Sequence, residues 1–149
     1  MIAIEKVDHV GIRITDKARA LPFYEMLGFQ VEHEVEFDAV IIVKNAASVE
    51  LNLIVNGVDK TGGKNILMDV ADKHPGVTHI AFRVPDIKAA MAVLKEHGVK
   101  ITQGPVTFGD GHVSVFVRDP DRNVIELRAR LAKEDADKIE GLVFYDPKA

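Results

Sequence analysis

The chain has 149 residues, no cysteine and a formal net charge of −4. Its length suits one domain with its own core, and 47% hydrophobic with 28% charged residues is typical of globular rather than disordered proteins. The absence of cysteine excludes disulfides, thiolate nucleophiles and sulfur-ligated zinc. The acidic balance argues against nucleic acids and membranes as partners, because both attract basic surfaces.

The first ten residues, MIAIEKVDHV, lack the basic, apolar and small-residue regions of a secretory signal. No apolar run approaches the ~18 residues that are needed to cross a bilayer. We therefore expect a soluble, cytoplasmic protein.

The first half of the chain is predicted to form a strand, a helix and three further strands. Val7–Ile14 alternates β-branched and polar residues, which predicts a strand. Asp16 suits a helix N-cap and Gly28 a helix end. Because Pro22 lies inside this helical stretch, we expect the helix to start late, with Pro22 in its first turn, or to bend there. The strand-like runs that follow are Phe29–Glu36, Asp38–Lys44 and Ser48–Val55.

The second half is predicted to repeat this order after a loop over residues 56–76, which contains NG, GG and PG pairs. Within that loop we expect a short helical turn at Ile66–Ala71. The predicted elements of the second half are a strand at Val77–Val84, a helix at Ile87–His97 and strands at Val99–Gln103, His112–Arg118 and Val124–Arg130. The tail, residues 131–149, is expected to hold a frayed helix and an apolar segment, LVFY, that docks on the protein or on a partner.

The two halves share a motif at a constant offset of 70 residues, as between His9 and His79. VDHVGIRITD at residues 7–16 recurs as VTHIAFRVPD at residues 77–86, and the glycines that end the helices, Gly28 and Gly98, follow the same offset. A fixed offset through a whole unit indicates an internal duplication. We therefore predict an α+β fold of two tandem βαβββ modules.

Each predicted module offers a histidine and a glutamate from a polar sheet face. Strand residues two or four apart point to the same side, so His9 lies with Arg13, and His79 with Arg83. The last strand of each module contributes Glu50 with Asn52, and Glu126. Such a face often needs no function, but the recurring histidine favours one. If a pseudo-twofold axis relates the modules, His9, Glu50, His79 and Glu126 can converge on a divalent metal, with Zn, Ni, Co, Mn or Fe(II) as candidates.

The stretches HVGIRI, FYEMLGF, VELNLI, THIAFRV and VRDPDRNVIEL resemble the vicinal oxygen chelate superfamily, and within it glyoxalase I. The resemblance covers residues 4–130, so we expect one domain there, with modules at about 4–56 and 76–130. It implies a cupped, mainly antiparallel sheet with helices on its outer face, often completed in a homodimer. The family's four metal ligands map onto His9, Glu50, His79 and Glu126.

The resemblance also implies a chemistry. Superfamily members bind neighbouring substrate oxygens to the metal and stabilise an enediolate, and a carboxylate moves the proton, here Glu126 or Glu50. The substrate would be a small molecule such as a thiol conjugate. Arg13 corresponds to an arginine that binds a glutathione carboxylate, and Asn52 and Arg83 are further candidates for substrate binding. Two positions depart from the family: Ile54 replaces an asparagine four residues after the first glutamate, and Arg122 replaces a glycine in the DPDG turn.

Other activities of this superfamily remain open. They are a coenzyme A epimerase similar to methylmalonyl-CoA epimerase, a two-His-one-carboxylate enzyme such as an Fe(II) dioxygenase or a fosfomycin-type transferase, and a metal-free binding protein resembling bleomycin-resistance proteins. Four further histidines are expected on the surface or in loops, with the last of them nearest a pocket: His33, His74, His97 and His112. We expect the FGDGH segment to form a hairpin turn or a mobile lid.

Overall fold

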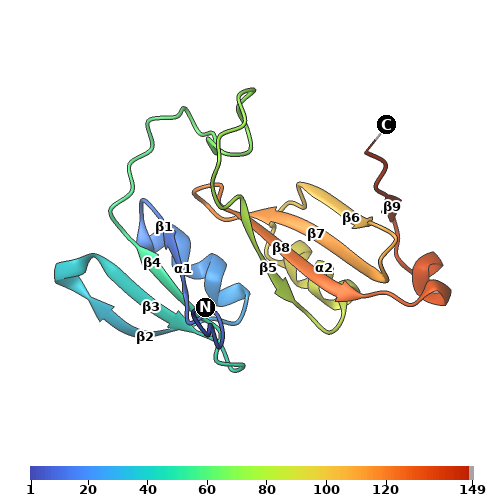
Figure 1. The fold of residues 1–149 in the computed structure, drawn as a ribbon, viewed down its shortest axis with the longest axis horizontal. Helices are drawn as coiled ribbons and strands as arrows, with labels where there is room; N and C mark the ends of the chain where they lie inside the picture. Colours follow the sequence, from blue (N-terminus) through green and yellow to red (C-terminus); the bar gives the residue numbers. More distant parts are fainter. Residues whose placement is uncertain (148–149) are drawn as a thin grey trace. The chain divides into compact units, whose positions relative to one another are not determined.

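The structure is a computed structural model that describes residues 1–147. The chain divides into two compact units, Met1–Gly63 and the part that begins at Lys64. Each unit carries one sheet and one α-helix (Figure 1). No helix in the described part of the chain is long and apolar enough to cross a membrane.

The first unit is a βαβββ module. Its elements are β1 (Val10–Arg13), α1 (Lys17–Met26), β2 (Gln30–Val35), a 3-10 turn η1 (Glu36–Asp38), β3 (Val40–Lys44) and β4 (Glu50–Ile54). The strand order is β1-β4-β3-β2, in which β1 runs parallel to β4 and the other neighbours are antiparallel. The core of the unit is apolar and includes the fully buried side chains of Ile14, Tyr24, Leu51 and Leu53.

The second unit repeats the module and adds a strand. Its elements are β5 (His79–Arg83), α2 (Ile87–Glu96), β6 (Gln103–Thr107), β7 (His112–Arg118), β8 (Val124–Arg130), a 3-10 helix η2 (Lys133–Lys138) and β9 (Val143–Phe144). The strand order is β5-β8-β7-β6-β9, and β5 is parallel to β8 as β1 is to β4. The predicted α+β fold of two tandem βαβββ modules is confirmed.

Local capping sets the start of both helices. Asp16 and Asp86 have extended backbones, and their carboxylates accept hydrogen bonds from the amides of Ala18 and Lys88 at 2.8 and 2.9 Å. The cap starts α1 at Lys17, so the expectation of a late start with Pro22 in the first turn is wrong, and Pro22 lies inside the helix.

Strand β6 starts later than expected. The prediction of a strand at Val99–Gln103 is wrong in its bounds, because the residues after α2 close the end of the helix: the amide of Val99 donates to the Leu94 carbonyl at 2.9 Å. The chain joins the sheet only at Gln103. By contrast, the predicted bounds of β7 and β8 are confirmed.

The tail contributes to the sheet of the second unit. Strand β9 pairs in parallel with β6, with Val143 opposite Val106, and the amide of Tyr145 donates to the Thr107 carbonyl at 2.9 Å. The ring of Tyr145 lies 5.1 Å from that of Phe108, which follows β6. The LVFY segment thus docks on the protein, one of the two places expected for it, and the expected frayed helix is the 3-10 helix η2.

Candidate functional site

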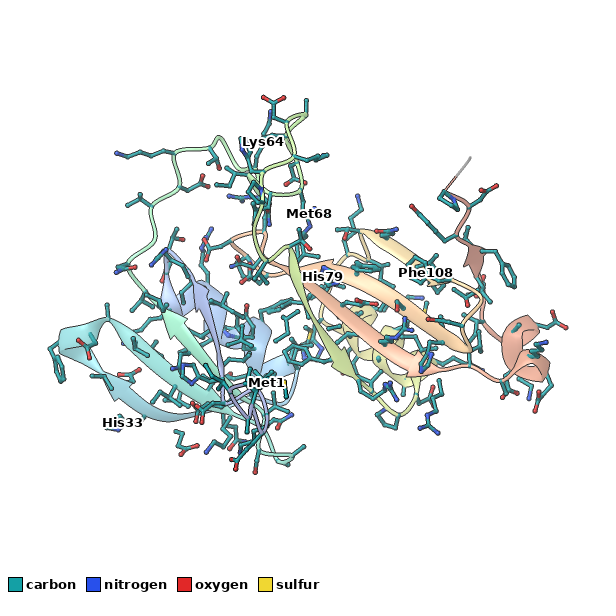
Figure 2. All side chains as sticks on the ribbon, viewed as in Figure 1. Met1, His33, Lys64, Met68, His79 and Phe108 are labelled. Carbon is teal, nitrogen blue, oxygen red and sulfur yellow. The ribbon has the colours of Figure 1, made fainter. Side chains whose placement is uncertain are left out.

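The second unit brings His79 and Glu126 into contact. His79 opens β5, where Figure 2 labels it, and Ala81 pairs with Glu126 of β8. His79 and Glu126 therefore lie diagonally on one face of the sheet, with 3.1 Å between His79 Nε2 and Glu126 Oε2. The Glu126 side chain is only 9% exposed, whereas that of His79 is 37% exposed. A buried carboxylate thus faces an imidazole that solvent can reach.

A chain of polar contacts supports Glu126 from behind. Ser114 Oγ on β7 donates to Glu126 Oε1 at 2.6 Å, and Arg128 Nη1 donates to Ser114 Oγ at 3.3 Å. Arg128 Nη2 also donates to Asp110, in the turn between β6 and β7. This bond to Arg128 lowers the pKa of Asp110 below its usual value. A buried carboxylate is costly without hydrogen bonds. The hydrogen bond from Ser114 therefore stabilises Glu126 at its buried position.

Two neighbours orient the His79 ring. Thr78 Oγ1 lies 2.9 Å from His79 Nδ1, and the ring of Phe116 meets the imidazole edge-on, with 5.8 Å between the ring centroids. With Nδ1 in contact with Thr78, Nε2 is the nitrogen that faces Glu126. A partner on one ring nitrogen is the usual way in which a protein orients the other nitrogen toward a ligand.

The first unit brings His9 and Glu50 together more loosely. His9 precedes β1, Glu50 opens β4, and His9 Nδ1 lies 3.7 Å from Glu50 Oε2. His9 Nδ1 is also 2.7 Å from Asp8 Oδ1, and this hydrogen bond lowers the pKa of Asp8. Asp8, His9 and Glu50 each offer one ligand atom, and these three atoms lie within 4.8 Å of one another. Sequence reasoning missed Asp8, although its place beside His9 was a usable signal.

The register of β1 and β4 singles out Asn52. Gly11 pairs with Asn52 in the first unit as Ala81 pairs with Glu126 in the second, and Gly11 and Ala81 are equivalent in the repeat. Asn52, not Glu50, therefore holds the position of Glu126. Asn52 Oδ1 is buried and accepts no hydrogen bond from the residues that the structure describes. An orphaned buried oxygen usually signals a missing partner.

Arg13 is hydrogen-bonded to the turn that follows β4. Its Nε donates to Asn56 Oδ1 at 3.0 Å. The family resemblance implies an asparagine four residues after the ligand on this strand. If that ligand is Glu50, the place is taken by Ile54, whereas if it is Asn52, the place is taken by Asn56. Arg13 and Arg83 are both exposed on their strands.

The four remaining histidines lie outside both pairs, and the expectation that His112 lies nearest a pocket stays a prediction. His33 on β2, His74 in the loop before β5 and His97 at the end of α2 are exposed, and none of them belongs to either pair. His112 is half-buried at the start of β7, with its Nδ1 3.1 Å from the Asp110 carbonyl oxygen. The FGDGH segment connects β6 to β7, as expected of a hairpin turn.

The donor atoms of both units fit a divalent metal. Imidazole nitrogens together with carboxylate or amide oxygens are ligands that Zn, Ni, Co, Mn and Fe(II) accept, and the orphaned Asn52 Oδ1 is an oxygen in need of such a partner. The structure pairs His9 with Glu50 and His79 with Glu126. The two pairs belong to different units, so the convergence of all four on one ion stays a prediction.

Comparison with known proteins relates the chain to one protein family. The family model described as "Glyoxalase/Bleomycin resistance protein/Dioxygenase superfamily" matches residues 6–127. The chain is 32% identical over 130 residues to the "Glyoxalase domain-containing protein RDO1" of Mycosarcoma maydis, covering 85% of this chain and 69% of the relative. It is 31% identical over 134 residues to the "Uncharacterized protein YaeR" of Escherichia coli strain K12, covering 85% of this chain and 98% of the relative.

Solved structures share the fold. The glyoxalase family protein from Enterococcus faecalis is 28% identical, with a TM-score of 0.67 over 83% of this chain and 97% of that one. A glyoxalase/dioxygenase from Nostoc punctiforme, 21% identical, gives the same TM-score of 0.67 over 85% of this chain and 92% of that one. The second likeness concerns the fold alone.

Proposed function

The chain belongs to the Glyoxalase/Bleomycin resistance protein/Dioxygenase superfamily, and from this premise we propose that it is a metal-dependent lyase of the glyoxalase I type. It would move a proton between neighbouring carbons of a small-molecule substrate. The observation that carries the proposal is that each repeat holds a histidine against a glutamate, at 3.7 Å for His9 and Glu50 and at 3.1 Å for His79 and Glu126.

The proposed metal ligands are His9, Glu50, His79 and Glu126. A bound divalent metal would act as a Lewis acid for negative charge that develops on substrate oxygens. Glu126 is nine-tenths buried and braced by Ser114, so it keeps its carboxylate in one place. His79 meets that carboxylate from the neighbouring strand, which brings a nitrogen and an oxygen donor to one point.

Two side chains of β4 compete to be the oxygen donor of the first unit. Glu50 carries a negative charge and lies near His9, but Lys44 Nζ also lies 3.7 Å from its Oε1. Asn52 is neutral, yet it occupies the position of Glu126 in the repeat and has an orphaned oxygen. The register therefore favours Asn52, and the charge favours Glu50. In the first case Asn52 would be a metal ligand, and in the second it would contact substrate.

Glu126 is the residue that we assign to proton transfer. A general base must be held within hydrogen-bond reach of the proton that it takes, and the bond from Ser114 fixes the Glu126 carboxylate while its Oε2 stays on the side of His79. Glu50, the other candidate, is half-buried and shares its carboxylate between His9 and Lys44.

Arg13 and Arg83 supply positive charge for an acidic group on the substrate. Guanidinium groups suit carboxylates because two parallel hydrogen bonds can form. Arg13 is held at its Nε by Asn56, which leaves its orientation defined at the exposed end of β1. A thiol conjugate with a carboxylate, such as a glutathione hemithioacetal, is the substrate class that we propose.

Metal analysis tests the proposal. Protein purified without chelators should carry a stoichiometric divalent metal, and His79→Ala and His9→Ala should each lower the bound metal strongly, because each removes one nitrogen donor. The matched control is His33→Ala, which removes an exposed histidine from β2. A metal-free wild-type protein, or metal retained in both ligand variants, would contradict the proposal and favour a binding protein.

Activity assays separate the enzyme classes. We expect turnover of methylglyoxal with glutathione that EDTA abolishes and the metal restores. Epimerisation of a racemisable acyl-CoA without glyoxalase activity would instead indicate the epimerase.

We also propose that the protein forms a homodimer. Sedimentation velocity measures the mass of the particle in solution and so tests this directly.

A further inference from the structure

The hydroxyl group of Ser114 is buried against the Glu126 carboxylate. Ser114 has no exposed surface, and its Oγ lies 2.6 Å from Glu126 Oε1. Its strand neighbours, Val113 and Val115, are also fully buried, so an apolar side chain would suit the burial of this position. A buried hydroxyl is costly unless it is hydrogen-bonded, and here its contacts are Glu126 and Arg128.

Arg128 determines which way the Ser114 proton points. A guanidinium group has donors only, so at 3.3 Å Ser114 Oγ must accept from Arg128 Nη1. The single hydroxyl proton of Ser114 then goes to Glu126 Oε1. Arg128 is itself held by Asp110. The order of donation is therefore Arg128 to Ser114 to Glu126, and it ends on one particular oxygen of the carboxylate.

The first unit lacks this support. Ser114 pairs with Arg128 between β7 and β8, and the matching pair between β3 and β4 is Val40 with Ile54. Both positions are apolar there, and the residue in the place of Glu126 is the neutral Asn52. The polar support thus occurs in the repeat that has the buried carboxylate and is missing where that position is an amide.

We propose that Ser114, oriented by Arg128, is a positioning residue that holds Oε1 of Glu126 and leaves Oε2 as the oxygen that would coordinate a bound metal. Binding through both oxygens would require Oε1 to give up the bond from Ser114, so the serine favours binding through one. This inference rests on the proposed function, because it takes Glu126 to be a metal ligand. Residues that orient a ligand in this way typically change metal affinity about 10–100-fold when they are removed.

Co²⁺ titration of the full chain tests the role, because the visible absorption of Co²⁺ reports both affinity and coordination. We expect Ser114→Ala to bind Co²⁺ about 10-fold more weakly and to alter the visible spectrum. Ser114→Thr, which keeps the hydroxyl, should restore affinity and spectrum. The matched control is Thr107→Val, since Thr107 is a buried hydroxyl on the neighbouring strand β6 whose Oγ1 accepts from the Gly109 amide.

The outcomes separate the two proposals. If the wild-type chain binds no Co²⁺, the metal site and the role of Ser114 are both overturned. If the wild type binds Co²⁺ and Ser114→Ala matches it in affinity and spectrum, only the role of Ser114 is overturned. An equal loss in Thr107→Val would also overturn it, since any buried hydroxyl would then have the same effect.

A second variant covers the case in which Ser114→Ala does not fold. Arg128 is partly exposed, at 24% of its side chain, so Arg128→Met removes the donor to Ser114 at less risk to the core. We expect a few-fold weaker Co²⁺ binding, because the Ser114 proton is then free to point away from Glu126. Unchanged affinity and an unchanged spectrum in Arg128→Met would overturn the proposal.

Discussion

Arg118 donates two hydrogen bonds to the carboxylate of Asp69, from Nη1 to Oδ2 at 3.0 Å and from Nη2 to Oδ1 at 2.9 Å. The pair joins the segment before β5 to the end of β7 within the second unit. The bonds from Arg118, followed by the bond from the Asn65 amide, lower the pKa of Asp69 from 3.8 to about 2.

This pair predicts a pH dependence of stability. Because the pKa of Asp69 is lower in the folded chain than the ordinary value of 3.8, the pair stabilises the fold fully above that value and loses its effect as the pH falls toward 2. At pH ~7, Asp69→Asn should cost about 0.5–1 kcal/mol in the free energy of unfolding. Thermal unfolding from pH ~7 down to pH ~2 should show the melting temperatures of the wild type and Asp69→Asn converging. The control is Asp72→Asn, an exposed change in the same loop. If the melting temperatures of the wild type and Asp69→Asn differed by the same amount at all pH values, the stabilising role of the Asp69 carboxylate would be contradicted.

Glu126→Gln should nearly abolish the lyase reaction. The substitution keeps the size of the side chain and an oxygen that can accept from Ser114, but it removes the proton acceptor. Positioned proton transfer contributes about 10²–10⁴-fold to a rate. Because Glu126 is also a proposed metal ligand, kcat with methylglyoxal and glutathione is measured at saturating metal, where we expect it to fall by that factor. Glu25→Gln, an exposed change on α1, should leave kcat unaltered. A kcat for Glu126→Gln close to that of the wild type would transfer the role to Glu50.

The donor from β4 can be identified by changing its charge. If Asn52 is the ligand, Asn52→Asp should tighten Co²⁺ binding because a carboxylate replaces an amide, and Asn52→Ala should weaken it at least ~10-fold. The Co²⁺ affinity of Glu50→Gln should then remain within ~3-fold of that of the wild type, which is a small change compared with the loss of a ligand. Isothermal titration calorimetry with Co²⁺ measures all three variants. The opposite order, with the large loss in Glu50→Gln, would assign the donor to Glu50.

Gly104 lies where its backbone leaves no room for a side chain. Its φ is 99°, and a Cβ built there would lie 2.5 Å from the Ser114 carbonyl oxygen. Gly109 also has a positive φ, 79°, but a Cβ there would meet nothing within 4 Å. Gly109→Ala should therefore cost about 1–2 kcal/mol from the backbone conformation alone. Gly104→Ala should lower the free energy of unfolding by about 1–3 kcal/mol more, because its Cβ would crowd the Ser114 carbonyl oxygen. Urea unfolding measures both, and equal costs would contradict the close approach of Gly104 to β7.

The helices and most strands were predictable because their signals are local. Asp16, Gly28, Asp86 and Gly98 bracket the two helices, since caps act on the nearest backbone groups. The bounds of β7 and β8 follow from alternation between clear turns. Even where the DPDG turn has Arg122 instead of glycine, the backbone keeps the left-handed conformation that glycine favours, with φ at 67°. By contrast, the start of β6 was misplaced, because the strand-like residues directly after α2 close the end of the helix and join no strand before Gln103.

For the site, the sequence by itself determined which residues share a face. A strand alternates sides with a period of two residues, so His79 with Arg83, and Glu50 with Asn52, could be grouped from their spacing. Only the tertiary structure decided which members of those groups meet, because the register between strands depends on pairing with distant segments. That register placed Asn52 in the position of Glu126, and the pairing of β7 with β8 brought Ser114 and Arg128 to Glu126. The alternation of side chains along a strand depends only on neighbouring residues, whereas the hydrogen-bond partners of a side chain depend on which strands pair in the folded sheet.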